Sequence, residues 1–140
     1  MFTRSGSARW QGGLKDGKGT VSTQSGALDG LPYGFNTRFG DEPGTNPEEL
    51  IGAAHAACFS MALSNLLSGA GIGGISIETT SKITLEKDGD GFTVTKAHLV
   101  TSISADADRA QIEDLAQKAK AGCPISKLLK AEVTMDATVA

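Results

Sequence analysis

Two cysteines, Cys58 and Cys123, carry the most distinctive chemistry in this sequence. They lie far apart along the chain, and neither belongs to a Cys-x-x-Cys pair. The two histidines, His55 and His98, do not complete a metal-ligand motif with them. The sequence also lacks a phosphate-binding loop, a dinucleotide-binding motif and a nucleophile elbow, because the glycine-rich residues 71–74 precede a predicted strand. Thiol chemistry is the class that remains.

Each cysteine also allows a plainer interpretation. Cys58 lies in an apolar stretch, where a cysteine commonly acts as a small, inert hydrophobic side chain. Cys123 directly precedes Pro124 at the predicted start of a short helix, where backbone N–H groups favour a thiolate. A reactive thiol pair and two inert core residues are both open on these grounds.

The element that must position Cys58 is a long helix within residues 45–69. Asn46 is a good N-cap, Pro47 suits the first helical position, and two glutamates follow where the helix dipole favours negative charge. Gly69 is a typical helix end. The sequence therefore predicts a helix over residues 47–68 with Cys58 in its middle.

This helix is apolar on nearly all sides, so it must be covered on all sides. A membrane span is disfavoured, because Glu48, Glu49, His55 and Asn65 would be costly in lipid. Small residues recur at every fourth position and would let another element approach closely: Gly52, Ala56, Ser60, Ser64 and Ser68. The rest of the chain is too small to wrap the helix, so we expect a second copy of the protein to help cover it.

The remaining pattern predicts an α+β fold in one domain, residues 1–140. Alternation and turn residues predict strands at 3–11 and 18–25, then a loop with strand-like pieces through 31–39, then a long hairpin over 75–103 with its turn at 88–91. A second helix is expected over 106–121 with Ala110, Ile112, Leu115, Ala116 and Ala119 on its apolar side, then a short helix from Pro124 and a closing strand over 131–139. His98 alternates out of phase with the apolar face, so we expect it to be exposed.

Composition excludes several classes of function. The net charge is −3 with scattered Lys and Arg, and aromatic residues make up only 5%, which disfavours nucleic-acid binding. Residues 1–10 lack the apolar core of a secretory signal, so we expect a cytoplasmic protein without a membrane segment. In a reducing compartment the cysteines are expected to be thiols rather than a permanent bridge.

Two stretches carry a family resemblance. Residues 45–60, TNPEELIGAAHAACFS, and residues 119–126, AKAGCPIS, resemble the osmotically inducible protein C (OsmC) family, a sister of the organic hydroperoxide resistance proteins. The resemblance extends over essentially the whole chain, and residues 19–23 and 32–39 are closer to the OsmC branch than to its sister. The two cysteine motifs in register are far more specific than either alone.

The resemblance implies an OsmC-like fold, with antiparallel sheets packed around a long central helix in an intertwined homodimer. It also implies a thiol-dependent peroxidase that reduces organic hydroperoxides, and hydrogen peroxide more slowly, without metal, haem or flavin. In such an enzyme Cys58 would be the peroxidatic thiol and Cys123 the resolving thiol. Formation of the disulfide requires Cα atoms within about 7 Å of each other, so the second helix must end against the middle of the first. The reductant implied is a dithiol, such as a lipoylated or thioredoxin-like protein.

A thiol in mid-helix is poorly solvated, so a cation must favour its thiolate. The resemblance implies Arg38, paired with and oriented by Glu48, although the sister branch places its arginine near the positions of Lys15 and Lys18. His55, one turn before Cys58, is a further candidate, and a core histidine with satisfied hydrogen bonds is the simpler interpretation.

Helix geometry adds an expectation about assembly. Glu48 and Cys58 are separated by roughly 15 Å along one helix axis, so a Glu48 that serves a Cys58 is expected to serve that of a partner subunit. The competing hypothesis is a dimeric module that binds a small ligand and carries two inert cysteines. A third hypothesis makes Cys123 the attacking thiol.

Overall fold

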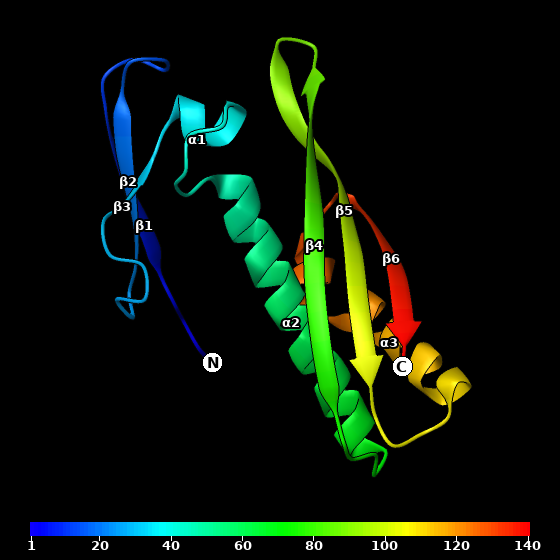
Figure 1. The fold of residues 1–140 in the computed structure, drawn as a ribbon. Helices are drawn as coiled ribbons and strands as arrows, with labels where there is room; N and C mark the ends of the chain where they lie inside the picture. The colour runs from blue at the N-terminus through cyan, green and yellow to red at the C-terminus, as the bar shows by residue number, and fades with distance from the viewer. The chain divides into compact units, whose positions relative to one another are not determined.

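Two separate sheets contain all the strands of this chain (Figure 1). The computed structural model describes residues 1–140, which form two compact units, residues 1–50 and 51–140. The first sheet belongs to the first unit and the second sheet to the second, and each unit is described by itself. The single domain expected from the sequence stays a prediction.

The first unit contains a small antiparallel sheet of β1 (Gly6–Gln11), β2 (Lys18–Thr23) and β3 (Leu31–Tyr33). Its aromatic pair is Trp10 and Tyr33, whose ring centroids lie 5.5 Å apart. Both rings lie over Gly19, where a Cβ atom would come within 2.7 Å of the Trp10 ring. The missing side chain at Gly19 is therefore what allows the two rings to meet on β2.

Residues 35–39 differ from the sequence prediction. Instead of the predicted loop with a strand-like piece they form the short helix α1 (Phe35–Phe39). The backbone N–H of Gly34 donates to the Thr37 hydroxyl at 2.8 Å, and that hydroxyl donates to the Gly34 carbonyl at 3.0 Å. This local pair of hydrogen bonds closes the first turn, so α1 and not an extended segment carries Arg38.

The long helix begins as predicted. It is α2 (Pro47–Gly69), and the Asn46 side chain accepts a hydrogen bond from the backbone N–H of Glu49 at 2.8 Å. The Asn46 amide also donates to the Thr37 carbonyl at 3.2 Å, which ties this cap to α1. The helix N-terminus is thereby fixed from two sides.

The second unit contains a sheet in the order β4–β5–β6. The predicted hairpin is confirmed as β4 (Ser76–Asp88) and β5 (Gly91–Ser104), which pair antiparallel. The closing strand is β6 (Glu132–Val139), and it pairs parallel to β5, which the sequence analysis did not anticipate. The reason is the crossover through α3 (Arg109–Gly122) and α4 (Pro124–Leu128), which returns the chain to the same end of the sheet.

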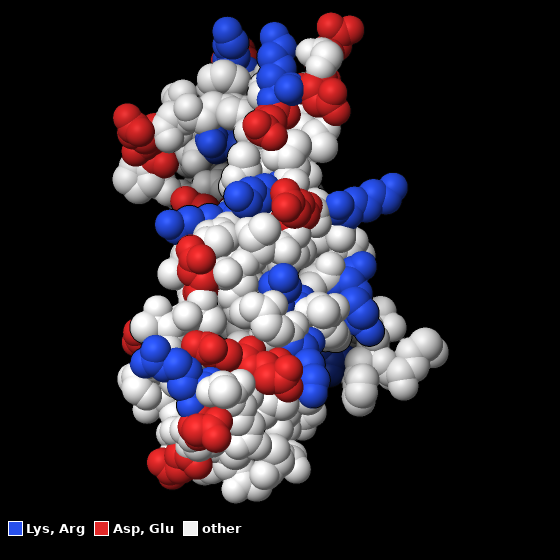
Figure 2. Space-filling view, turned by 90° about the vertical axis from the view of Figure 1, so that its right-hand side faces the viewer, with Lys and Arg blue, Asp and Glu red and all other residues white.

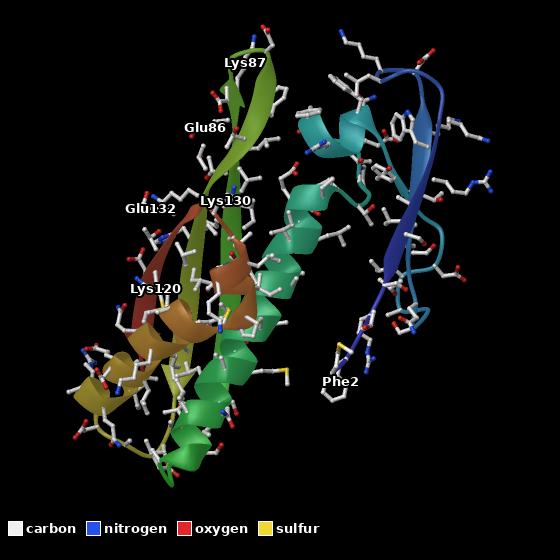
Figure 3. All side chains as sticks on the ribbon, turned by 180° about the vertical axis from the view of Figure 1, so that it is seen from behind. Phe2, Glu86, Lys87, Lys120, Lys130 and Glu132 are labelled. Carbon is white, nitrogen blue, oxygen red and sulfur yellow. The ribbon has the colours of Figure 1, made fainter.

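The helices of this unit cover one face of the β4–β5–β6 sheet, as Figures 1 and 3 show from opposite sides. Their buried side chains form one core with the inward-facing residues of β5 and β6. It is built from Phe59, Leu63 and Leu67 of α2, Leu99 and Ile103 of β5, Ile112, Ala116 and Ala119 of α3, and Val139 of β6. Ala110 was expected on the apolar side of α3 but is exposed, because it lies in the first turn, away from the sheet.

The length and composition of α2 alone would allow it to cross a membrane, and it is the one helix of the chain that passes this test. Core helices pass the same test. Here the α2 face with Phe59, Leu63 and Leu67 is fully buried in the protein's own core. Packing in the core therefore explains why that face of α2 is apolar. Met61, on another face, is 75% exposed.

The opposite face of the sheet is polar. His98 projects there, with its ring nitrogens 2.6 Å from the Thr134 hydroxyl and 3.0 Å from a carboxylate oxygen of Asp136. The His98 side chain is 24% exposed, so the expectation that it would be exposed was wrong. The parallel neighbour β6 supplies both partners and covers part of the ring.

Acidic and basic side chains are mixed on the surface. On the face that Figure 2 presents, Lys and Arg alternate with Asp and Glu and leave no large patch of one sign. This face therefore offers no continuous basic surface to a phosphate backbone, in agreement with the net charge of −3.

Candidate active site at the two thiols

The structure brings the two cysteines of the second unit together. Cys58 projects from the middle of α2, and Cys123 is the N-cap of α4. The two thiols are within hydrogen-bonding reach of one another, and both are free. Cys58 is partly exposed and Cys123 is fully buried. A disulfide between them would require their Cα atoms to lie within about 7 Å of each other.

The start of α4 supplies a backbone hydrogen bond to each sulfur. The N–H of Ile125 donates to Cys58, and the N–H of Ser126 donates to the Cys123 sulfur at 3.3 Å. Pro124 has no N–H, and its fixed backbone suits the first helical position. The sequence prediction of Cys123 as the cap and Pro124 as the first helical residue is confirmed.

The surroundings of Cys58 nevertheless oppose its thiolate. Burial raises the pKa of the Cys58 thiol above its ordinary value of 9.0, and the neighbouring Cys123 raises it further. The N–H of Ile125 lowers it but does not compensate. A reactive Cys58 therefore needs a positive charge that these surroundings do not supply.

His55 lies one turn before Cys58 and is fully buried. Its ring nitrogens pair with two hydroxyls: Nδ1 lies 2.7 Å from Ser81 Oγ on β4, and Nε2 lies 2.8 Å from Ser126 Oγ on α4. His55 is thus a core histidine with satisfied hydrogen bonds, and it does not bond Cys58. Burial lowers the pKa of its imidazole from 6.5, so the ring is neutral at physiological pH.

Ser126 links His55 to Cys123. The Cys123 thiol donates to the Ser126 hydroxyl at 3.3 Å, and this hydroxyl also meets the His55 ring. Sequence reasoning missed Ser81 and Ser126. The alternation of β4, which turns Ser81 toward the core, and the position of Ser126 in the first turn of α4 are the signals that point to them.

Gly52 explains how His55 reaches β4. A Cβ atom at Gly52 would lie 2.8 Å from the backbone carbonyl oxygen of Ser81, closer than side chains normally approach. The missing side chain lets the α2 backbone lie directly against β4. His55, one turn further along α2, then contacts the hydroxyl of the same Ser81.

The predicted basic residue lies in the first unit. Arg38 of α1 makes a two-pronged ion pair with Glu48, with Nε to Oε1 at 2.8 Å and Nη2 to Oε2 at 3.0 Å. Both guanidinium contacts lock the orientation of Arg38. Lys15, the other basic candidate, lies 5.9 Å from the ring centroid of Phe35, and Lys18 lies on β2.

A shallow groove in the second unit lies beside the thiols, between α2 and the junction of α3 and α4. Its walls combine small and apolar side chains with two polar ones: Ala62, Asn65, Leu66, Lys118, Ala119, Gly122 and Pro124. Ala62 follows Cys58 by one helical turn, and Gly122 and Pro124 flank Cys123. The structure contains no group of three or more His, Cys, Asp or Glu residues that could hold a metal ion.

This fold, with helices packed on a sheet and two free thiols in reach of each other, belongs to the α+β class. The profile of the family described as OsmC-like protein matches residues 40–138, and the chain belongs to this family. The chain is 56% identical to Peroxiredoxin OsmC of Escherichia coli (strain K12) over 134 residues, which cover 95% of this chain and 94% of that protein.

Other relatives are more distant. The organic hydroperoxide resistance protein OhrB of Bacillus subtilis (strain 168) is 33% identical over 116 residues, covering 82% of this chain and 84% of that one. The OhrB crystal structure superposes with a TM-score of 0.72 over 99% of this chain and 98% of that one, at 28% identity. An OsmC-like protein of unknown function from Vibrio cholerae O1 gives a TM-score of 0.77 at 18% identity, covering 98% and 99% of the two chains, and shares the fold.

Proposed function

We propose that this protein is a cysteine-based peroxidase that reduces organic hydroperoxides, and hydrogen peroxide more slowly. The observation that carries the proposal is the pair of free thiols in mutual reach, one partly exposed and one buried. The names of two relatives support it, because one is a peroxiredoxin and another is an organic hydroperoxide resistance protein.

The difference in exposure supports our assignment of roles to the two thiols. A hydroperoxide reaches Cys58 from solvent, whereas Cys123 has no accessible surface. The Cys58 thiolate attacks one peroxide oxygen, the O–O bond breaks, and an alcohol leaves after protonation of the alkoxide. Cys123 then attacks the sulfenic acid on Cys58, which releases water and forms the disulfide. This supports Cys58 as the attacking thiol over the hypothesis that gave this role to Cys123.

Arg38 is the proposed cation that favours the Cys58 thiolate, with Glu48 holding it in place. The need for a cation follows from the raised pKa of the Cys58 thiol. Glu48 lies in the first turn of α2, roughly 15 Å along the helix axis from Cys58. We therefore propose that Arg38 and Glu48 act on the Cys58 of a partner subunit.

The dimer is supported by the uncovered face of α2. Ala53, Ala54, Ala57 and Met61 are exposed on a helix that has no charged residue after Glu49. An apolar helix face of this kind is typical of a surface that a second copy covers. For the positive charge that favours the Cys58 thiolate, Lys15 and Lys18 are the alternative to Arg38.

The disulfide must be reduced for a second turnover. A small dithiol or a dithiol protein, lipoylated or thioredoxin-like, is the proposed reductant, since exchange with a dithiol regenerates both thiols. A reducing cytoplasm is the proposed location, since both cysteines are free thiols.

The central test is an anaerobic titration with one equivalent of cumene hydroperoxide. We expect the loss of both thiols and a crosslink between Cys58 and Cys123 on mass spectrometry. A sulfenic acid should be trapped in the Cys123→Ser variant and not in Cys58→Ser. Retention of both thiols would contradict the proposal and favour the alternative, a dimeric small-ligand-binding module with inert cysteines, which the apolar groove beside the thiols also fits.

A second experiment tests the shared site. Arg38→Met should slow oxidation of Cys58, whereas the matched control Lys15→Met should not. Mixing Arg38→Met subunits with Cys58→Ser subunits should restore activity if each Arg38 serves the partner's thiol. A mixture as inactive as its components, or an active monomer in sedimentation equilibrium, would refute the shared site.

A further inference from the structure

Three polar side chains, two of them buried and Ser81 half-buried, lie behind the thiols in an unbroken chain of hydrogen bonds. The chain runs from Ser81 through His55 and Ser126 to Cys123, with distances of 2.7, 2.8 and 3.3 Å. His55 and Cys123 have no accessible surface, and Ser126 is 8% exposed. The attack of the proposed hydroperoxide on Cys58 uses none of the other three side chains.

The partners fix the direction of the hydrogen bonds. The Cys123 thiol donates to Ser126 Oγ. The Ser126 hydroxyl then has its own hydrogen free to donate, and His55 Nε2 is the acceptor in reach. His55 must therefore carry its ring hydrogen on Nδ1, where it donates to Ser81 Oγ. Every bond in the chain points away from the Cys123 sulfur.

We propose that Ser126 and His55 form a proton relay that removes the proton of Cys123 when this thiol attacks the sulfenic acid on Cys58. The inference rests on the proposed peroxidase function, which supplies the sulfenic acid. Ser126 and His55 are positioning and relay residues for the second step, since neither side chain touches the hydroperoxide or Cys58.

The step balances. An electron pair of Cys123 forms the S–S bond, and the S–O bond of the Cys58 sulfenic acid breaks with its pair on the oxygen. The Cys123 proton moves to Ser126 as the Ser126 proton moves to His55 Nε2. The proton lost by Cys123 and the hydroxide lost by Cys58 together make one water molecule. No other oxidant or reductant is required.

His55 is also in the neutral form that a proton acceptor needs. A neutral imidazole has a lone pair to receive the proton, and burial keeps this ring neutral by lowering its pKa. No charged residue hydrogen-bonds to His55, Ser81 or Ser126, so no competing donor occupies the lone pair on Nε2. Burial also disfavours a lasting imidazolium, so His55 gives the proton up again once the disulfide has formed.

The acceleration that the relay can give to the attack of Cys123 has an upper bound. An ordinary thiol is only a few per cent ionised at pH 7, so a relay that completes the ionisation accelerates attack by up to about 30-fold.

The experiment separates the two thiol reactions in Ser126→Ala, which removes only the hydroxyl. Rapid mixing with one equivalent of cumene hydroperoxide, followed by acid quenching and mass spectrometry, gives the rate of Cys58 oxidation and the rate of disulfide formation. We expect unchanged Cys58 oxidation and disulfide formation slower by 10- to 30-fold at pH 7. Ser126→Thr, which keeps a hydroxyl, should restore the wild-type rate.

Further oxidation of Cys58 competes with disulfide formation and provides an independent measurement of the relay. With excess hydroperoxide a slowly resolved sulfenic acid is oxidised further to sulfinic acid. The hydroperoxide concentration that converts half of Cys58 to sulfinic acid should fall in Ser126→Ala by the same factor as the rate of disulfide formation. His55→Gln, which keeps an acceptor but not a base, should behave alike and carries the test if Ser126→Ala does not fold. His98→Gln changes the other histidine, on the far face of the sheet, and is the matched control.

Two results would overturn the relay. One is disulfide formation at the wild-type rate in both Ser126→Ala and His55→Gln. The other is an equal slowing of Cys58 oxidation in the same variants, which would mean that the two side chains only hold the fold. If the wild-type Cys58 itself fails to react, the proposed peroxidase function is refuted instead.

Discussion

Replacement of Gly52 by alanine tests the contact between α2 and β4 directly. The new Cβ would lie 2.8 Å from the Ser81 carbonyl oxygen, against about 3.4 Å for ordinary contact. The obstacle is backbone in a paired strand, so α2 must move away from β4 by roughly 0.6 Å. The His55–Ser81 hydrogen bond, now 2.7 Å, would stretch to roughly 3.3 Å.

The loss of stability caused by the clash at Gly52 can be isolated with a control variant on the same helix. Alanine in place of glycine stabilises a helix by up to about 1 kcal/mol, whereas overpacking a tight contact costs about 1–3 kcal/mol. A Cβ at Gly69 would meet nothing within 4 Å, so Gly69→Ala has the gain without the clash. Gly52→Ala should therefore be less stable than Gly69→Ala by about 1–3 kcal/mol.

Two measurements check this prediction. Urea unfolding gives the free energies of both variants, and the difference should appear as several °C in thermal unfolding. Histidine side-chain nitrogen shifts in NMR report the weakened bond of His55. Equal stability of the two variants would refute the idea that Gly52 is required for the approach of α2 to β4.

Three further predictions concern stability. Asn46→Ala removes the acceptor for the Glu49 N–H and should cost about 1 kcal/mol in urea unfolding, whereas Asn46→Asp should recover most of it. The free energy of unfolding should fall as pH drops below 6.5, because His55 takes up a proton there when unfolded but has a lower pKa when buried; this slope should be reduced in His55→Gln. Thr101→Val, which removes a buried hydroxyl bonded to Thr79 at 3.0 Å, should cost about 1 kcal/mol or less, and no measurable loss would mean that this hydrogen bond is energetically neutral.

Local signals in the sequence were sufficient for most elements. The cap at Asn46, the alternation and turn of the hairpin, and the proline after Cys123 each predict structure from neighbouring residues, and each prediction is confirmed. The helix α1 was missed because its first turn depends on Thr37 bonding back to Gly34, which no periodicity indicates.

The environment of the thiols was less predictable. Serines are common in loops and strands, so neither Ser81 nor Ser126 stands out until the fold brings both to His55. The parallel placement of β6 was missed for a similar reason, since alternation gives the face of a strand but not its direction. Both depend on contacts between distant parts of the chain.

The parallel crossover also has a consequence for synthesis on the ribosome. Cys58 emerges long before Cys123, and β6, which pairs with the middle strand, is translated after both. A nascent chain therefore carries the Cys58 thiol for a time without Cys123 beside it. A thiol oxidised at that stage can be repaired only by other thiols, such as glutathione, until Cys123 has been made and folded into place.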